Sequence, residues 1–135
     1  MTSLALSPIT ASLLVATGGA IGAVGRYQLG LTLAQWLRPN TGFPWATLSA
    51  NIIGSLAMGL LVGWLARNGD SGESMRLFIG VGLLGGFTTF SAFSLEMMLL
   101  IERGSLGLAM AYAGASVLAG LLALYFGLIA MRGLA

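Results

Sequence analysis

The chain has 135 residues, of which 57% are apolar and only 7% are charged, and its mean hydropathy is +0.94. A soluble domain carries about 25% charged residues because its surface faces water, and disorder requires low hydrophobicity with high net charge. Both classes are therefore excluded, and the net charge of +2 is too small for a nucleic-acid interface. The composition indicates a protein of the lipid bilayer that has no nucleic-acid partner.

The sequence also lacks Cys and His. Without Cys there is no thiolate nucleophile and no Cys-ligated metal, and without His the usual general base and commonest metal ligand is missing. We therefore do not expect an enzyme.

The few charged residues divide the chain into four long apolar stretches. A bilayer core about 30 Å thick requires roughly 20 helical residues. The predicted spans are residues 9–33, 43–66, 77–101 and 106–131, joined by short connections at 38–42, 67–76 and 102–104. The predicted fold is one all-α transmembrane domain over residues 1–135, with no soluble domain and no secretory signal.

The arginines give almost no preferred orientation in the membrane. Four spans place Arg67, Arg76 and Arg132 on one side and Arg38 and Arg103 on the other. If Arg26, the sixth arginine, reaches an interface, the number of arginines becomes three on each side. Since the positive-inside rule requires an asymmetry, either insertion in both orientations or a fixed orientation set by a weak bias fits this pattern.

The first span contains Arg26 directly after a glycine-rich stretch, residues 18–25. Glycines let two backbones approach closely. The arginine could supply the positive charge of an anion vestibule, or its side chain could reach up to the lipid headgroups.

The second span contains Asn51 and Ser55, four residues apart and therefore on one helix face. Polar groups inside a membrane are candidates for function. The alternative for Asn51 is a hydrogen bond within a tight helix pair.

The third span has four glycines and two adjacent threonines at its centre, residues 80–89, which is a poor helical sequence. We predict a break at residues 85–89. Unwound backbone at membrane depth must be buried or line a cavity, and its free carbonyls would suit a cation such as Na⁺. Phe87, Phe90 and Phe93 follow at intervals of three, and their positive ring edges could face an anion or simply pack. Glu96 lies about two turns later, where it could pair with an arginine or lie at an interface.

The fourth span places Tyr112, Ser116 and Gly120 at steps of four on one face. Two hydroxyls along one stripe could pass an ion along, although small residues there also suit helix packing. Because the buried groups of the four spans are mainly hydrogen-bond donors and no acid lies at the membrane centre, the inventory favours an anion pathway.

Three segments in order resemble the Fluc/CrcB family of fluoride channels. They are residues 22–26 (GAVGR), residues 47–55 (TLSANIIGS) and residues 82–96 (GLLGGFTTFSAFSLE). The third is the most specific, and the length and four-span plan also match.

The resemblance implies an antiparallel homodimer of dual topology in a bacterial plasma (inner) membrane, which would export fluoride passively and reduce fluoride toxicity. It also implies a structural, non-transported Na⁺ held by the carbonyls of Gly85 and Thr88. The fluoride pathway implied by the family is formed by Asn51, Phe90, Phe93, Thr89, Ser91, Tyr112, Ser116 and Arg26.

Two positions depart from the family pattern. Ala92 stands where a threonine is frequent, and Gly120 stands where some relatives have a second serine. We therefore expect a shorter polar track, with either a changed rate or water that fills the gap.

Two other functions remain as alternatives. A proton-coupled cation antiporter of the small multidrug resistance type would require an embedded Glu in the first span, where this chain has Arg26 and no acid. A purely structural subunit would conduct no ions and would tolerate changes at Asn51 and Phe90.

Overall fold

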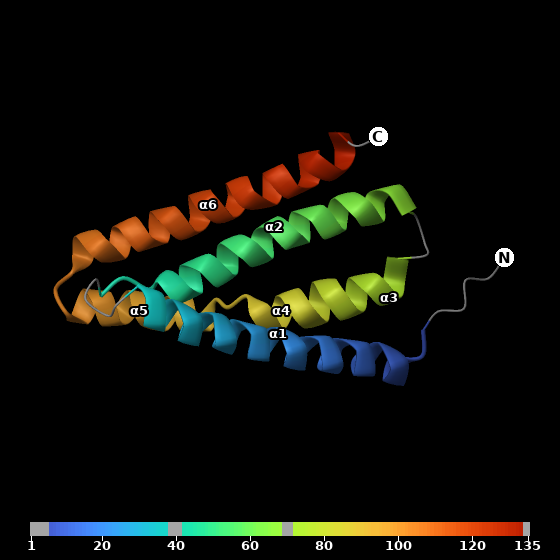
Figure 1. Ribbon diagram of the computed structural model, residues 1–135, viewed down its shortest axis with the longest axis horizontal. Coiled ribbons are helices and arrows are strands. Elements are labelled where there is room, and N and C mark those ends of the chain that lie inside the picture. The colour runs from blue at the N-terminus through green and yellow to red at the C-terminus, as the bar shows by residue number, and fades with distance from the viewer. Residues whose placement is uncertain (1–5, 38–41, 69–71, 134–135) are drawn as a thin grey trace.

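The computed structural model describes residues 6–37, 42–68 and 72–133, and all of its regular secondary structure in these residues is helical (Figure 1). The elements are α1 (Pro8–Trp36), α2 (Trp45–Asn68), α3 (Glu73–Met75), the π-helix η3 (Arg76–Leu84), α4 (Gly85–Phe87), α5 (Ser91–Glu102) and α6 (Leu106–Gly133). Four segments are long and apolar enough to cross a membrane, with α3 to α5 forming the third. The prediction of an all-helical chain with four spans is confirmed.

The predicted connections at 38–42 and 67–76 lie partly outside the described residues. The connection between α5 and α6 is a tight turn, in which Gly104 has φ +75° and Ser105 N–H donates to the Leu100 carbonyl at 2.9 Å. A left-handed backbone favours glycine, which explains Gly104 at this point.

The helices associate as two parallel pairs. In Figure 1, α1 and η3–α4 run in one direction, and α2 and α6 run in the other. Glycines form both contacts: a Cβ on Gly22 would collide with the Leu83 backbone, and one on Gly59 with the Leu124 carbonyl. In a membrane, where apolar burial does not drive association, such close backbone packing is a main source of helix affinity.

The third span is broken later than predicted. Helical structure stops after Phe87 and resumes at Ser91, and Thr88 is extended with ψ 158°. Gly85 and Gly86 were predicted to be unwound but remain helical. The reason is packing, since a Cβ on Gly86 would collide with the Gly19 backbone.

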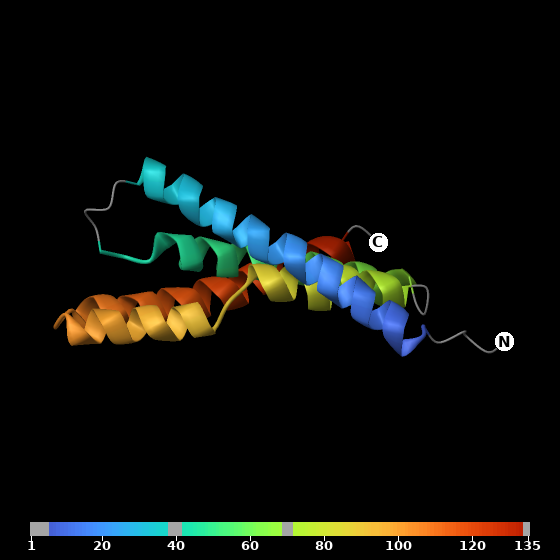
Figure 2. The ribbon, with the colours of Figure 1, turned by 90° about the horizontal axis from the view of Figure 1, so that it is seen from below.

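The break lets the third span change partners. Before it, η3 and α4 pack against α1, whereas after it α5 packs against α6. Figure 2 shows this as a divergence of α5 from the line of α1. The break therefore lies where both helix pairs meet.

Most large apolar side chains point outward. Leu118, Leu121, Leu122 and Phe126 of α6 are all exposed, and Tyr112 is the only large side chain among the described residues that is fully buried. An apolar exterior of this kind is what lipid contact or a second protein copy requires.

Candidate functional site

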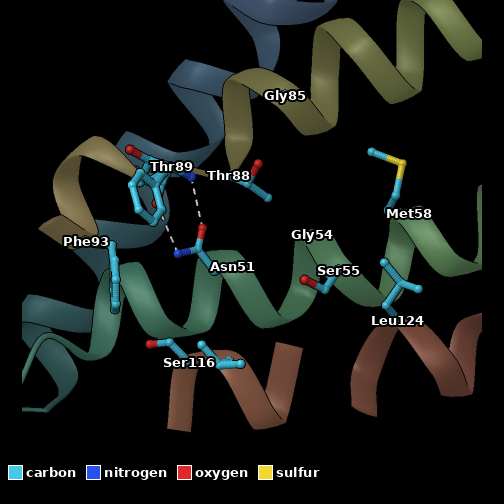
Figure 3. A pocket seen from close by; sticks show the side chains of 12 residues that line it. Asn51, Gly54, Ser55, Met58, Gly85, Thr88, Thr89, Phe93, Ser116 and Leu124 are labelled. Atoms are coloured by element: carbon cyan, nitrogen blue, oxygen red, sulfur yellow. Dashed lines mark hydrogen bonds between the residues drawn. The ribbon is translucent and has the colours of Figure 1, made fainter. Parts of the chain in front are cut away.

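A hollow of about 500 Å³ opens at the break, between α2 and α6 (Figure 3). Its polar lining comes from α2, the break and α6, namely Asn51, Ser55, Thr88, Thr89 and Ser116. Phe90, Phe93, Met58, Val117 and Leu124 supply most of the apolar wall. Of the eight residues that the sequence assigned to an ion pathway, five line this hollow.

Asn51 binds the backbone of the break at two points. Its Nδ2 donates to the Thr89 carbonyl at 3.1 Å, and the Thr89 N–H donates to its Oδ1 at 2.9 Å (Figure 3). An unwound segment leaves backbone groups without helical partners, and such groups are costly in a membrane. The Asn51 amide satisfies two of them. One N–H of its NH₂ group remains for another acceptor.

Carbonyls at the break, those of Gly85 and Thr88 among them, lose the hydrogen bonds that a continuous helix would give them. The Thr89 N–H, which would bond to Gly85, donates to Asn51 instead. The Ala92 N–H, which would bond to Thr88, donates to Thr89 Oγ1 at 3.2 Å. Gly85 and Thr88 are the two residues whose carbonyls the family resemblance assigned to sodium. Carbonyl oxygens are suitable ligands for a hard cation.

The aromatic pair at the break is asymmetric. Phe90 is 79% exposed, whereas Phe93 is half-buried, and their ring centroids lie 5.8 Å apart. The hollow thus has one ring at its open rim and one in its wall.

The two predicted hydroxyls of α6 separate in the structure. Ser116 Oγ is buried in the hollow and has no hydrogen-bond partner in the described chain. Tyr112 does not line the hollow. It lies behind Phe93, with the two ring centroids 5.1 Å apart.

Sequence reasoning missed the group that surrounds Glu96. Thr47 Oγ1 donates to Glu96 Oε1, and the Tyr112 hydroxyl donates to Oε2, both at 2.7 Å. Each carboxylate oxygen therefore has a donor from a different helix, and neither donor is an arginine. The available signal was depth: Thr47 and Tyr112 lie about two turns or less after the N-terminal ends of α2 and α6, and Glu96 lies about two turns before the C-terminal end of α5.

Arg26 lies on α1 beside the break. Its Nε donates to the Gly86 carbonyl at 3.4 Å, and the side chain is half-buried.

The remaining hydroxyls at the break bond locally. Thr89 Oγ1 lies 3.4 Å from Ser91 Oγ, and Ser91 is exposed outside the hollow. Ala92 gives the hollow no hydroxyl, and a Cβ on Gly120 would lie 3.5 Å from Ser55 Oγ. A serine at that point would thus lie next to Ser55.

Comparison with known proteins shows the same similarity over nearly the whole chain. The family model described as CrcB-like protein, camphor resistance (CrcB), matches residues 13–128. A protein from Novosphingobium aromaticivorans is 57% identical over 94% of this chain and 100% of its own length. Proteins from Sphingopyxis alaskensis and Phenylobacterium zucineum are 56% and 54% identical over about nine-tenths of this chain. All three carry the name fluoride-specific ion channel FluC.

Proposed function

Because the chain belongs to the CrcB-like family, we propose that it is a passive, fluoride-selective channel. The observation that carries the proposal is the donor-lined hollow at the broken third span. The relatives of this chain are named fluoride-specific ion channels, a class that performs no catalysis.

The chemistry of the hollow suits a small anion. The Ser116 hydroxyl has no partner in the described chain, and the Asn51 amide keeps one N–H after binding Thr89. Phe90 and Phe93 can direct positive ring edges at an anion. Fluoride holds its water tightly, so it requires donors of this kind to replace that water, and a narrow passage excludes larger halides.

We assign the section beyond Phe93 to Tyr112, Thr47 and Glu96. The hydroxyls of Tyr112 and Thr47 both donate to the Glu96 carboxylate. When fluoride arrives, either hydroxyl can rotate toward it. Arg26 is assigned to the vestibule, where its charge attracts anions toward the break, and Thr89 and Ser91 supply hydroxyls there.

The functional unit is proposed to be an antiparallel homodimer. One side of the hollow is open, and the Phe90 ring at its rim is 79% exposed. A second copy would cover both. Dual insertion agrees with the small arginine bias, because neither orientation is strongly preferred.

A structural Na⁺ is proposed at the centre of this dimer. The carbonyls of Gly85 and Thr88 fit the role because each lacks its helical donor. Two copies related by a two-fold axis would present both carbonyls twice. Among residues 6–37, 42–68 and 72–133 there is no cluster of acidic side chains that could hold a metal ion. In this proposal the sodium is not transported, and it stabilises the dimer by joining the carbonyls of both copies.

The channel is proposed to act in the bacterial inner membrane. A negative interior drives an anion outward by about 2.3 kcal/mol per charge per 100 mV. Fluoride would therefore leave the cytoplasm without an energy source, and its toxicity would fall.

The deciding experiment is anion efflux from proteoliposomes, recorded with fluoride and chloride electrodes side by side. Rapid fluoride loss without chloride loss is expected. Equal passage of both anions would overturn the proposal. Proton-coupled cation flux that Glu96→Gln abolishes would favour an antiporter instead.

A further inference from the structure

Five aromatic rings form a continuous ladder from the start of α2 to the rim of the hollow. In order they are Trp45, Phe43, Tyr112, Phe93 and Phe90, and successive centroids are 4.6, 5.5, 5.1 and 5.8 Å apart. Four of these rings belong to helices or to the break. Phe43 alone comes from the non-helical segment before α2.

The local sequence fixes the direction of Phe43. Gly42 before it has φ +61°, a conformation that other residues rarely adopt. Pro44 after it restricts Phe43 to extended backbone. The Phe43 carbonyl also accepts a hydrogen bond from the Trp45 N–H at 2.9 Å. The short segment is thus a rigid support for one side chain.

That side chain supports Tyr112. The two rings meet edge to face, at an interplanar angle of 78°, and Tyr112 is completely buried. On its other side Tyr112 contacts Phe93. Held between the two rings, Tyr112 directs its hydroxyl to Glu96 Oε2 at 2.7 Å. Without Phe43, the Tyr112 ring would have space to tilt away from Glu96 and Phe93.

We propose that Phe43 is a positioning residue of the anion pathway, which acts by holding Tyr112 between Phe93 and Glu96. This inference rests on the proposed channel function. It assigns to the segment 42–44 a role in conduction, although that segment does not line the hollow.

The test compares fluoride efflux for Phe43→Leu and Phe43→Trp. Leucine keeps the apolar bulk but has no ring. The rate of fluoride efflux is therefore expected to fall about threefold to tenfold, which corresponds to the interaction free energy of one aromatic pair. Tryptophan restores a ring and is expected to keep at least half of the rate. Trp36→Leu is the matched control, because Trp36 is 81% exposed and outside the ladder.

A double-mutant cycle separates positioning from general packing. In a Tyr112→Phe background the hydroxyl is already lost, so Phe43→Leu is expected to change the rate less than twofold. Gly42→Ala provides a second route: its Cβ meets no atom within 4 Å, so only the backbone conformation is altered. It should slow efflux with all five rings intact, even if Phe43→Leu fails to fold.

The outcomes distinguish the two proposals. A wild-type protein that passes no fluoride overturns both of them. If the wild type conducts and Phe43→Leu matches it, only the role of Phe43 is overturned. That role is also overturned if Phe43→Leu is equally damaging with and without the Tyr112 hydroxyl.

Discussion

Asn51 and Thr89 exchange two hydrogen bonds between α2 and the break in the third span: the side-chain amide of Asn51 binds both the N–H and the carbonyl of Thr89. This pair joins α2 to the broken third span. The bond from the Thr89 N–H also removes the donor that the Gly85 carbonyl would have in a helix. One asparagine therefore both stabilises the break and leaves a carbonyl free at it.

Asn51→Asp is expected to abolish most fluoride transport while the protein still inserts. The carboxylate can accept from the Thr89 N–H, but it cannot donate to the Thr89 carbonyl, and it places negative charge in the path of an anion. We expect efflux to fall at least tenfold. Ser49→Ala, on the same helix, is the control and should retain the wild-type rate. Unchanged efflux in Asn51→Asp would contradict both the pairing and the pathway.

The sequence was sufficient to predict the four spans because charges in a membrane protein are confined to a few places. It was also sufficient to single out Asn51, since an amide in an apolar span requires a partner. It could not name that partner, because Thr89 lies 38 residues away. The break was predicted too early in the sequence for a related reason. The low helix propensity of glycine indicated residues 85–89, but packing against Gly19 keeps Gly86 helical.

Sequence reasoning did not find the group around Glu96, because depth in the spans was its only signal and the partners are far apart in sequence. Thr47 is 49 residues away and Tyr112 is 16 residues away. Only the tertiary arrangement brings the three hydroxyl and carboxylate groups together. The prediction that placed Tyr112 on one stripe with Ser116 did not reveal that Phe93 lies between Tyr112 and the hollow.

Phe90→Ile tests the exposed ring at the rim. Because Phe90 is 79% exposed in the single chain, its replacement should hardly affect the folding of one subunit. The branched side chain offers no positive ring edge to an anion, so fluoride efflux should fall at least tenfold. Leu95→Ala, at an exposed position on α5, is the control for loss of apolar surface. Equal rates in both variants would remove Phe90 from the pathway.

Tyr112→Phe tests the carboxylate group by stability. Removing the hydroxyl leaves Glu96 Oε2 without its donor, which should cost about 1–3 kcal/mol of unfolding free energy. The measurement is reversible denaturation in detergent. Tyr125→Phe removes a hydroxyl from a 58% exposed side chain of the same helix and should change stability by less than about 0.5 kcal/mol. Equal effects would mean that the Tyr112–Glu96 bond contributes nothing.

Gly22→Ala tests the close backbone contact between α1 and the third span. The added Cβ would collide with the Leu83 carbonyl and with the Phe87 N, which are backbone atoms and cannot move independently of their helix. Overpacking of this kind costs about 1–3 kcal/mol. Since Phe87 directly precedes the break, separation of the two helices should also displace Thr88 and reduce fluoride efflux.

Gly114→Ala is the matched control for Gly22→Ala. It also adds one methyl group to the middle of a spanning helix, but this methyl group meets no atom within 4 Å in the chain. It should be neutral or slightly stabilising, since alanine is the better helix former by about 1 kcal/mol. The two variants are compared by denaturation in detergent and by efflux. A loss of stability in Gly114→Ala as large as in Gly22→Ala would show that glycine flexibility matters more than close packing. A loss confined to Gly22→Ala would show that close backbone contact with α1 holds the break in place.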